Sequence, residues 1–581
     1  MKTLLWFFQE RFTQAISRAF RELPEEVADI APCNQEEFGH YQCNSPLRLA
    51  KLLKKSPRDV AQALINALDE EVVKICSRIE IAGPGFINLT LSPSALSREV
   101  DALLADPYLG APRVAVPQKV IVEFSSPNIA KELHVGHLRS TIIGDCLARL
   151  FEFLGEDVLR LNHIGDWGTQ FGMLIAYIQE FQKRVLLGDV RIDLSSLMAW
   201  YRSAKELFDK DPEFKKRAQL EVVRLQSGDP DAKKIWQTIC MVSREGFQEI
   251  YDLLDVHIQE RGESFYNPFL KSVVEELERS NLVVVSDGAK CIFLEGFVNR
   301  EGEPLPLMIQ KSDGGYNYDT TDMAALHYRI FEDRADRIII VTDSGQNLHF
   351  QLVFGVGRKA GWVKGNKPQL DHVSFGLVLG PDGKKFKTRS GETEKLMDLL
   401  TEAVDRARKV IVERYLECSG EDLENLARTI GIGALKYADL SSHRTKDYTF
   451  SYDRMLRFEG NTAVFLLYAY VRIQGIKRKT QADLKTLLKT AHMHLMHPSE
   501  ISLGLHLRRF GETLDEVARD LLPNRLTDYL YILAEKFNAF FRDCRVEGAE
   551  EEGSRLLLCE ATSRVLKQGL QILGLNTVDR M

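Results

Sequence analysis

The sequence contains no C-x-x-C pair, and its cysteines are scattered along the chain. There are nine of them in 581 residues, an odd number without the spacing of a disulfide framework or a zinc site. No apolar run is long enough to cross a bilayer. The apolar start of the chain ends at Gln9, with no cleavage site for a signal peptide behind it. We therefore expect a cytoplasmic protein with reduced thiols, no bound metal and no membrane anchor.

Internal repeats, low-complexity tracts and an excess of positive charge are also lacking. The net charge is -7 and the pI is near 6.1. This balance argues against a protein that coats nucleic acid indiscriminately, but it leaves room for a local basic track. The chain is too long for a single hydrophobic core, so we expect roughly two to four domains.

Three blocks follow one another along the chain. Residues 1–112 combine helical periodicity with alternating strands, which predicts a small α+β module ending in a proline-rich linker. Residues 113–455 open with the buried strand Val120-Ile121-Val122 and a long helical pattern, typical of a parallel α/β sheet. A polar helical insertion is expected at about 183–256. Residues 456–581 carry helical apolar stripes and predict a bundle.

Local patterns predict further elements within these blocks. Apolar runs predict buried strands at 158–161, 337–341 and 373–379. The segment 282–294 alternates around Ser286-Asp287-Gly288 and predicts a β-hairpin. Helices are expected at about 135–154 and, in the first block, over 47–67.

The most informative segment places two histidines where the first buried strand leads into a helix. His134 and His137 flank Gly136 at this turn. Imidazole N–H donors and the free amides of a helix N-terminus can converge on one anion, which predicts a phosphate site. Glycine would leave room there for a flat base to pack on the backbone. The alternative is that the two histidines merely share one face of a helix.

The surrounding residues favour the phosphate site. The string EFSSPNIAKELHVGHLRSTIIGD, residues 123–145, resembles the HIGH signature of class I aminoacyl-tRNA synthetases and, as a whole, their arginine-specific family. The run from Asn162 to Gly172 is similar to the segment that follows in that family. The resemblance extends over essentially the full chain. It implies a Rossmann-like catalytic domain, an N-terminal module that contacts the tRNA and a C-terminal helical domain that reads the anticodon.

The resemblance also implies a reaction in two steps. Arginine is activated by ATP, with Mg²⁺ accompanying the nucleotide, to give arginyl-adenylate. The arginyl group then passes to the 2'-OH of the 3'-terminal adenosine of tRNA(Arg). The expected partners are therefore ATP, L-arginine and tRNA(Arg), and the protein is expected to be a monomer.

A lysine-rich loop is the second signature of the class. The run GPDGKKFKTR at residues 380–389 follows a predicted strand, where a loop flanked by glycines can close over phosphates. It departs from the family's KMSK pattern, because Thr388 stands where the second lysine is expected if Lys385 is the first. The lysines expected near the phosphates are Lys384, Lys385 and Lys387, together with Lys131 just before the histidines.

Arginine as a substrate requires buried carboxylates, because a guanidinium stays protonated and is best held by bidentate partners. The resemblance assigns its side chain to Glu263, Tyr318 and Asp322. It assigns the amino and carboxylate groups to Glu123, Ser126, Asn128 and Gln346. Tyr318 and Asp322 are four residues apart and would share one face of a helix. Without the family, each acid would be interpreted as a surface residue or a helix cap.

RNA contacts require basic and aromatic side chains. The candidates for base contacts are Phe86 and Asn88. The candidates for phosphate contacts are Lys54, Lys55, Lys477, Arg478, Lys479, Arg508 and Arg509, and the alternative for each of these is a solvated face. The histidine-rich stretch 492–497 matches no zinc spacing and predicts the polar end of a helix.

Two other interpretations remain open at this point. A tRNA-binding paralogue without catalytic activity would keep the fold; the altered lysine loop favours it, whereas the intact histidines and acids do not. A small-molecule adenylyltransferase would share the H-x-G-H turn but would not need the helical block 456–581.

Overall fold

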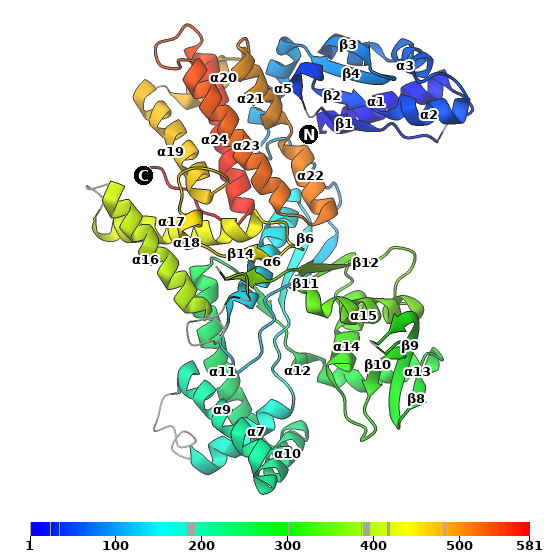
Figure 1. The fold of residues 1–581 in the computed structure, drawn as a ribbon, viewed down its shortest axis with the longest axis vertical. Helices are drawn as coiled ribbons and strands as arrows, with labels where there is room; N and C mark the ends of the chain where they lie inside the picture. The colour runs from blue at the N-terminus through cyan, green and yellow to red at the C-terminus, as the bar shows by residue number, and fades with distance from the viewer. Residues whose placement is uncertain are drawn as a thin grey trace. The chain divides into compact units, whose positions relative to one another are not determined.

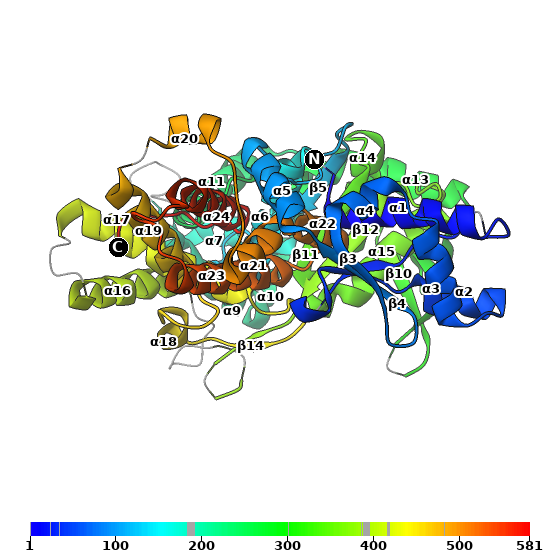
Figure 2. The same cartoon turned by 90° about the horizontal axis from the view of Figure 1, so that it is seen from above.

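The computed structural model describes the chain except for residues 1, 24, 34, 183–191, 300, 381, 385, 387–394, 415–418 and 482. The chain forms two compact units, both discontinuous in sequence (Figures 1 and 2). The first comprises Met1–Ala115, Tyr415–Ser441 and Met455–Met581. The second comprises Val116–Arg414 and Ser442–Arg454.

A five-stranded parallel sheet organises the second unit, in the order β12-β11-β5-β6-β7. The strands are β5 (Lys119–Glu123), β6 (Asp157–Asn162), β7 (Gln259–Glu260), β11 (Arg337–Asp343) and β12 (Gln369–Phe375). The predicted strands at 158–161 and 337–341 are thus confirmed. β5 comes first in the chain and lies at the centre, with Val120 paired to Val158 on one side and Arg337 on the other. In such sheets ligands bind at the carboxyl ends of the strands where the strand order reverses, which here is between β5 and β11.

The strand predicted at 373–379 is wrong in one respect, because it is interrupted. β12 ends at Phe375, and the separate strand β13 (Val378–Leu379) pairs in parallel with β14 (Tyr448–Thr449). Gly376 lies between them, and a Cβ there would lie 2.7 Å from the Lys446 backbone. The break is therefore set by a segment about seventy residues further along the chain, which the local pattern does not contain.

Helices and a second sheet extend from the parallel sheet. Their bounds are α6 (Val135–Leu154), α12 (Glu263–Tyr266), η2 (Asn267–Phe269), α13 (Leu270–Arg279), β8 (Val284–Ser286), β9 (Ala289–Val298), β10 (Pro304–Gln310), α14 (Tyr318–Phe331), η3 (Ser344–Gln346), α15 (Asn347–Lys359) and α16 (Leu396–Arg414). The predicted hairpin is confirmed as β8 and β9, joined at Asp287 and Gly288, which have φ angles of 50° and 78°. Both residues with positive φ are typical of a two-residue hairpin turn.

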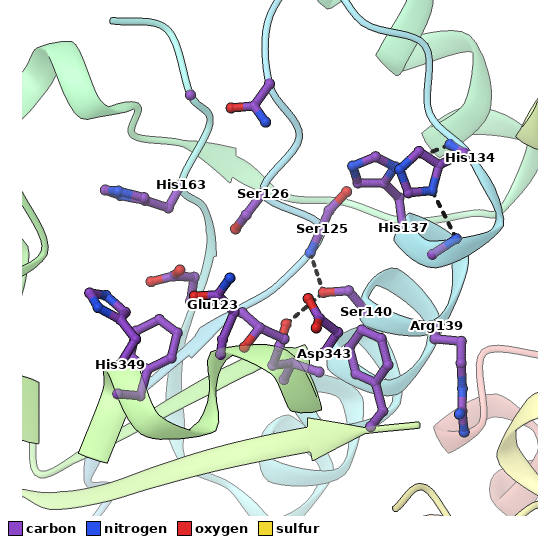
Figure 3. A pocket seen from close by; sticks show the side chains of 18 of the residues that line it. Glu123, Ser125, Ser126, His134, His137, Arg139, Ser140, His163, Asp343 and His349 are labelled. Carbon is purple, nitrogen blue, oxygen red and sulfur yellow. Dashed lines mark hydrogen bonds between the residues drawn. The ribbon is translucent and has the colours of Figure 1, made fainter. Parts of the chain in front are cut away.

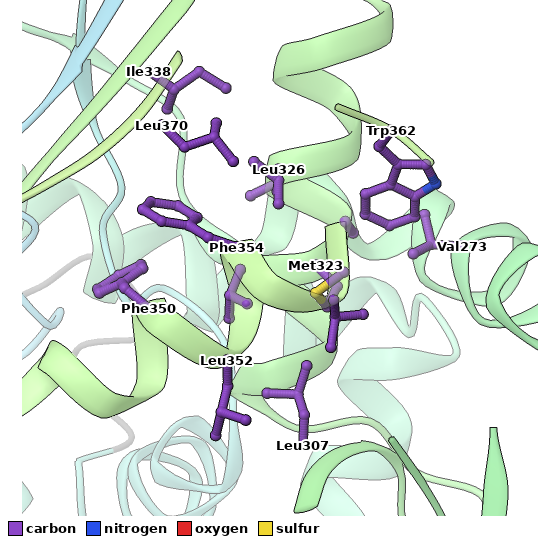
Figure 4. Packing of buried hydrophobic residues seen from close by; sticks show 14 of the residues in the cluster. Val273, Leu307, Met323, Leu326, Ile338, Phe350, Leu352, Phe354, Trp362 and Leu370 are labelled. Carbon is purple, nitrogen blue, oxygen red and sulfur yellow. The ribbon is translucent and has the colours of Figure 1, made fainter. Parts of the chain in front are cut away.

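The core of this region lies between α14, α15 and the sheets (Figure 4). Met323 and Leu326 of α14 pack with Phe354 of α15 and with Trp362, all at most 5% exposed. Burying side chains of this size contributes about 1.5–3 kcal/mol each. The first turns of α14 and α15, which supply residues to the cavity described below, are therefore fixed by this core.

A helical subdomain interrupts the sheet between β6 and β7. Its helices are α7 (Thr169–Phe181), α9 (Leu194–Lys210), α10 (Pro212–Gln226) and α11 (Pro230–Leu253). They gather together in Figure 1. Met173 of α7 packs with Ala204 of α9 and with Phe214 of α10. α7 therefore shares the core of the helices that follow it, although the insertion was expected to begin at about 183.

The first unit begins with an α+β module whose antiparallel sheet has the order β1-β2-β4-β3. Its elements are α1 (Leu4–Ala19), β1 (Ile30–Pro32), η1 (Glu36–Phe38), β2 (Tyr41–Cys43), α2 (Ser45–Leu53), α3 (Pro57–Asn66), α4 (Glu70–Ile75), β3 (Cys76–Ala82), β4 (Phe86–Leu91) and α5 (Pro93–Ala105). The single helix expected over 47–67 is wrong. Lys54 takes a left-handed backbone conformation, φ 52°, and the Ser56 side chain caps α3 by accepting from the Asp59 amide.

Helices form the rest of the first unit. They are α17 (Gly420–Leu440), α18 (Tyr452–Met455, at the border of the two units), α19 (Ala463–Thr480), α20 (Leu484–Thr490), α21 (Pro498–Arg508), α22 (Phe510–Asp520), α23 (Asn524–Asp543) and α24 (Glu552–Ile572). α17 precedes residue 456, where the bundle was expected to start. His497 caps α21, as predicted for this histidine-rich stretch. Among the helices in the described part of the chain, none is both long and apolar enough to cross a membrane.

Arg508 has a structural position, and the expectation that it contacts RNA is wrong. The residue is 1% exposed. Its Nε donates to Glu99 at 2.8 Å and its Nη2 donates to the Lys2 carbonyl at 2.8 Å. The neighbouring Arg509 donates to the His40 carbonyl at 2.6 Å. Both arginines thereby join the bundle to the α+β module within the first unit.

Candidate active site

A cavity of about 490 Å³ lies in the second unit at the carboxyl ends of β5 and β11. The rings of His134 and His137 lie side by side on one side of it, and Glu123, His163 and His349 lie on the other (Figure 3). The sequence-predicted residues that line it are Glu123, Ser126, Asn128, His134, Gly136, His137, Glu263, Tyr318, Asp322 and Gln346. The fold thus brings together every residue predicted to bind arginine and the three residues of the H-x-G-H turn.

A buried hydrogen-bond network fixes the loop between β5 and α6. Ser125 has a φ of 69° and Ser126 a φ of 49°, conformations that cost non-glycine residues about 1–3 kcal/mol each. The Ser125 amide donates to Ser140 Oγ at 2.9 Å, and that hydroxyl donates to the Val341 carbonyl at 2.6 Å. The hydroxyls of Ser125 and Tyr251 lie 2.7 Å apart. The sequence analysis missed these supports, because they come from segments far apart in the chain.

The two histidines cap α6 reciprocally. His134 Nδ1 accepts from the Gly136 amide at 3.0 Å, and His137 Nδ1 accepts from the His134 amide at 3.1 Å. The His137 amide donates to the His134 carbonyl at 2.8 Å. The expectation that free helix amides bind the anion is therefore wrong for Gly136 and His137, whose amides are used within the cap. A neutral imidazole that accepts at Nδ1 carries its proton on Nε2, which is then the donor nitrogen of the ring.

Contact with the His134 ring is a further reason for glycine at position 136, besides the predicted room for a base. A Cβ at this position would lie 2.8 Å from His134 Cε1 and 3.0 Å from Nδ1. The ring of His134 and a side chain at 136 therefore cannot coexist in this geometry. Burial, followed by the charges of His134 and Lys131, lowers the pKa of His137 to about 3. His137 is accordingly neutral at physiological pH, with its ring nitrogens in the donor and acceptor roles just described.

Glu123, at the end of β5, is paired inside the protein. Its Oε2 lies 2.5 Å from Arg329 Nη1 on α14, and the two residues are 4% and 2% exposed. Burial by itself would lower the pKa of Arg329, but Glu123, together with Tyr266 and Asp322, more than compensates and the pKa is raised. The sequence analysis missed Arg329, which lies about two hundred residues from its partner with no local signal. The other carboxylate oxygen of Glu123, Oε1, is not the one that forms this ion pair.

The acids of the opposite wall lie on the first turns of α12 and α14. Tyr318 and Asp322 both belong to α14, which confirms that they are one turn apart on a helix. Asp322 Oδ2 lies 2.6 Å from His349 Nε2. Asp322 Oδ1 lies 3.7 Å from His163 Nε2.

Glu263 is the most strongly perturbed carboxyl group of the cavity. Burial, together with the charges of Asp322 and Asp166, raises its pKa to about 8. Its backbone is held by a 3.0 Å bond from its amide to the Ile164 carbonyl. Glu263 is therefore largely protonated in the empty site at neutral pH, and a bound cation would favour its ionised form.

The predicted contacts to the amino and carboxylate groups of the substrate are polar and oriented. The buried Ser126 hydroxyl has no hydrogen-bond partner among the described residues. Asn128 bridges to Gly165, where a Cβ would lie 2.1 Å from Asn128 Oδ1. Gln346 ends η3, directly before α15. Each of these groups can therefore serve a polar ligand without breaking a structural bond that the fold requires.

Of the basic residues predicted near the phosphates, the described ones, Lys131 and Lys384, do not line the cavity. Lys385 and Lys387 fall outside the described residues. The Lys384 carbonyl accepts from the Gly380 amide at 2.7 Å, and its side chain is exposed. Lys131 is exposed too, and its charge helps to lower the pKa of His137. Beyond the undescribed part of the loop, Lys395 Nζ lies 2.9 Å from Glu132 Oε1, beside the H-x-G-H turn.

Four of the residues predicted to contact tRNA lie in the first unit, with different exposure. Phe86 is half-buried, whereas Asn88 is 2% exposed and accepts from Gln42 Nε2 at 2.7 Å. Lys477 is paired with Glu560 at 2.6 Å. Arg478 is exposed and donates to the Asp579 carbonyl at 3.0 Å. Among the four, Phe86 and Arg478 therefore have the more accessible side chains.

The fold and the paired histidines agree with the family models that match the chain. The model described as tRNA synthetases class I (R), catalytic domain, matches residues 99–452. The second unit therefore carries a class I aminoacyl-tRNA synthetase catalytic domain. The Arginyl tRNA synthetase N terminal domain matches residues 7–91, and the DALR anticodon binding domain matches residues 466–581. The chain belongs to the arginyl-tRNA synthetase family.

Individual relatives match over their whole length. The arginine-tRNA ligases of Protochlamydia amoebophila and Chlamydia caviae are 61% and 52% identical, with complete coverage of both chains in each comparison. The crystal structure of arginyl-tRNA synthetase from Plasmodium falciparum is 34% identical, covers 100% of each chain and has a TM-score of 0.87. The interpretation as an inactive tRNA-binding paralogue is not supported, and the match of a helical anticodon-binding domain also argues against a small-molecule adenylyltransferase.

Proposed function

We infer that the protein ligates arginine to its tRNA in two ATP-dependent steps. The observation that carries this inference is one cavity with paired imidazoles on one side and Glu263, Tyr318 and Asp322 on the other. The imidazole side suits the phosphates of ATP, and the acidic side suits a guanidinium. The spacing of the two sides in a single cavity allows the two substrates to react with each other.

In the first step, an oxygen of the arginine carboxylate attacks the α-phosphorus of ATP. A bond forms between that oxygen and phosphorus, the bond to the bridging oxygen breaks, and pyrophosphate leaves. The Nε2–H groups of His134 and His137 would donate to the phosphate oxygens as charge shifts onto the leaving group. Lys131 and the loop lysines 384, 385 and 387 would neutralise pyrophosphate. The nucleotide would bring Mg²⁺ as its counter-ion, as part of the substrate.

Arginine would be held along the opposite wall. Asp322 and Glu263 would accept from the guanidinium, with Tyr318 covering it. Glu123, Ser126, Asn128 and Gln346 would orient the amino and carboxylate groups, so that the attacking oxygen faces the α-phosphorus. Positioning of this kind supplies much of the rate enhancement when no protein nucleophile takes part.

In the second step, a hydroxyl of the tRNA's terminal adenosine attacks the carbonyl carbon of arginyl-adenylate. AMP leaves with the electron pair of the broken bond, and the hydroxyl proton is lost to phosphate or water. By analogy with the class, this hydroxyl is the 2'-OH. Phe86, Lys477 and Arg478 remain proposed contacts to tRNA(Arg), whereas the buried Asn88, bonded to Gln42, does not. A cytoplasmic monomer remains the expected state of the protein.

The function is tested by aminoacylation with each of the standard amino acids in parallel, using total tRNA and ATP. Arginine alone should be incorporated, with AMP formed in equal amount. Arginine-dependent exchange of pyrophosphate into ATP, measured with tRNA present, reports the first step separately. Incorporation of a different amino acid, or no exchange under any condition, would contradict the proposal.

A further inference from the structure

His349 contacts two residues of the proposed arginine site, Asp322 and Tyr318. It lies in the first turn of α15, with its side chain 12% exposed. Its Nε2 lies 2.6 Å from Asp322 Oδ2, and its Nδ1 lies 3.4 Å from Asp319 Oδ1. The centroid of its ring is 5.2 Å from that of Tyr318. Figure 3 shows the ring at the edge of the cavity, opposite the paired histidines.

The charge of His349 is determined by these two carboxylates. Burial is the largest influence and lowers the pKa, and a cation in the first turn of a helix is also disfavoured by the helix dipole. The bonds to Asp319 and Asp322 more than reverse both effects and raise the pKa to about 9. His372 is close enough for the charge of His349 to lower its pKa. His349 is therefore an imidazolium at neutral pH, sharing its charge between two acids.

This arrangement fixes one oxygen of Asp322 and leaves the other for a ligand. Oδ2 accepts the charged hydrogen bond from His349, a bond that holds the χ angles of the aspartate. Oδ1 lies 3.7 Å from His163 Nε2, which is beyond hydrogen-bond distance. A guanidinium that enters the cavity would therefore meet an aspartate that is already oriented.

We propose that His349 positions Asp322 for the guanidinium of the substrate and so determines the specificity of the site for arginine. This inference rests on the proposed function, because it requires Asp322 to bind arginine. Without His349, Asp322 would lie near Asp319 and Glu263, and the nearby cation Arg329 is already paired with Glu123, so that repulsion would turn Asp322 away or protonate it. The histidine also balances one negative charge, so that the pocket carries the charge that suits a single cation.

The test is a set of substitutions at His349 that separates the hydrogen bond from the packing. His349→Ala and His349→Leu both remove the donor, and the leucine retains apolar volume beside Tyr318. His349→Gln retains a neutral donor near the position of Nε2. Steady-state aminoacylation should give a KM for arginine raised about 10-fold to 100-fold in the two donorless variants, and by a smaller factor in His349→Gln. The KM for ATP should stay within about two-fold, because the histidine pair is not changed.

A matched control is His327→Ala. His327 lies on the same helix as Asp322 and contacts a carboxylate, Glu276, at 3.1 Å, but it does not line the cavity. The His327→Ala variant should have lower thermal stability than the wild type but the same KM for arginine. If a donorless variant does not fold, as judged by circular dichroism, His349→Gln and direct calorimetric titration with arginine take its place.

The outcomes distinguish this inference from the function on which it rests. A wild-type protein that does not charge tRNA with arginine overturns both. A wild-type protein that charges arginine, with folded His349 variants that keep its KM for arginine, overturns the inference alone. If the KM values for arginine and for ATP rise equally in the donorless variants, and His349→Gln restores neither, His349 has a purely structural role. That result would also overturn the inference.

Discussion

His134 and His137 each use one ring nitrogen to cap α6, and both residues line the cavity. Their Nδ1 atoms accept hydrogen bonds from the backbone amides of His134 and Gly136 at the start of α6. The same hydrogen bonds cap the helix and fix the tautomer of each neutral ring. The rings lie 4.0 Å apart between centroids, close enough to serve one phosphate group. The structural and the proposed catalytic contributions can be separated by substitution, because they depend on different nitrogens.

Asparagine offers that separation at both positions. Its side-chain oxygen can replace Nδ1 as the acceptor, but it has no atom where Nε2 lies. We expect His134→Asn and His137→Asn to keep the melting temperature within about 2 °C, while arginine-dependent pyrophosphate exchange falls about 100-fold or more. His134→Ala should lose the cap as well, which costs about 1 kcal/mol. Full exchange activity in either asparagine variant would contradict a role of these nitrogens at phosphate.

Glu263 makes arginine binding dependent on pH. Its pKa in the empty site is about 8, and the guanidinium requires the ionised form, so binding releases a proton below that pH. We expect the Kd for arginine to fall as the pH rises from about 6 to about 8, and Glu263→Gln to bind arginine more weakly and without this slope. Calorimetry in buffers of different ionisation enthalpy measures the proton directly. A Kd independent of pH in the wild-type protein would show that Glu263 stays protonated when arginine binds.

The same carboxyl group has the opposite effect on the stability of the empty protein. In the unfolded chain Glu263 ionises near its ordinary pKa of 4.5, whereas in the folded chain it holds its proton up to about 8. The unfolded state therefore binds fewer protons between these values, and the contribution of Glu263 to stability decreases as the pH rises through this window. Activity and stability consequently respond to pH in opposite directions at this residue.

Among the secondary-structure elements, α6 connects the paired histidines to the segment that leads into the lysine-rich loop. Arg139, one turn after the histidines, is 1% exposed. Its Nη1 donates to the Gly376 carbonyl at 2.8 Å and to the Lys446 carbonyl at 3.3 Å. Gly376 lies at the break between β12 and β13, and β13 leads into the loop. One side chain of α6 therefore helps to place the strand from which the loop starts.

Replacement of Arg139 should affect stability and the first reaction step together. We expect Arg139→Met to lower the free energy of unfolding by about 1–3 kcal/mol, because buried carbonyls lose their donor. The KM for ATP should rise, since β13 is no longer held against the helix that carries the histidines. Arg139→Lys retains one charged donor, so its free energy of unfolding and its KM for ATP should lie between those of Arg139→Met and the wild type. Urea titration and pyrophosphate exchange measure the two effects, and an unchanged KM for ATP in the folded Arg139→Met variant would refute the link to the loop.

At the scale of the whole molecule, residues distant in sequence join the α+β module and the bundle into the first unit. The buried Glu512 of α22 accepts from the Leu5 amide at 2.9 Å and from the Tyr41 hydroxyl at 2.8 Å. Arg508 adds bonds to Glu99 and Lys2. The first and the last block of the chain thus share buried polar contacts, which need all their partners in order to be favourable.

Substitution by methionine should have different effects on stability and tRNA binding at two arginines of this unit, Arg508 and Arg478. Arg508→Met should lower the free energy of unfolding by about 1–3 kcal/mol, a range that allows for the partial exposure of Glu99. The exposed Arg478→Met should change it by less than about 0.5 kcal/mol, and should weaken tRNA binding and reduce its salt dependence. Urea unfolding and filter binding of tRNA(Arg) at several salt concentrations make the comparison. If Arg508→Met is as stable as the wild type but binds tRNA more weakly, Arg508 contacts RNA after all, contrary to its buried position.

Local patterns account for the elements that were predicted well. The helix over 135–154, the strands at 158–161 and 337–341 and the hairpin around Asp287 depend on periodicity and turn chemistry within a few residues. The predictions are wrong where contacts with other groups in the folded chain determine the local structure. The strand at 373–379 breaks because β14 binds it, and the Gly136 and His137 amides are not free because the ring and the carbonyl of His134 accept them.

The sequence by itself determined the family, the reaction and the residues of the H-x-G-H turn and the acidic wall, because these depend on residue types in a fixed order along the chain. The tertiary structure decided which of their atoms are available to a ligand. Arg329 takes one oxygen of Glu123, and His349 takes one oxygen of Asp322. Burial beside other acids keeps the proton on Glu263. Charge, hydrogen bonding and desolvation depend on distances between segments that the chain brings together only when it folds.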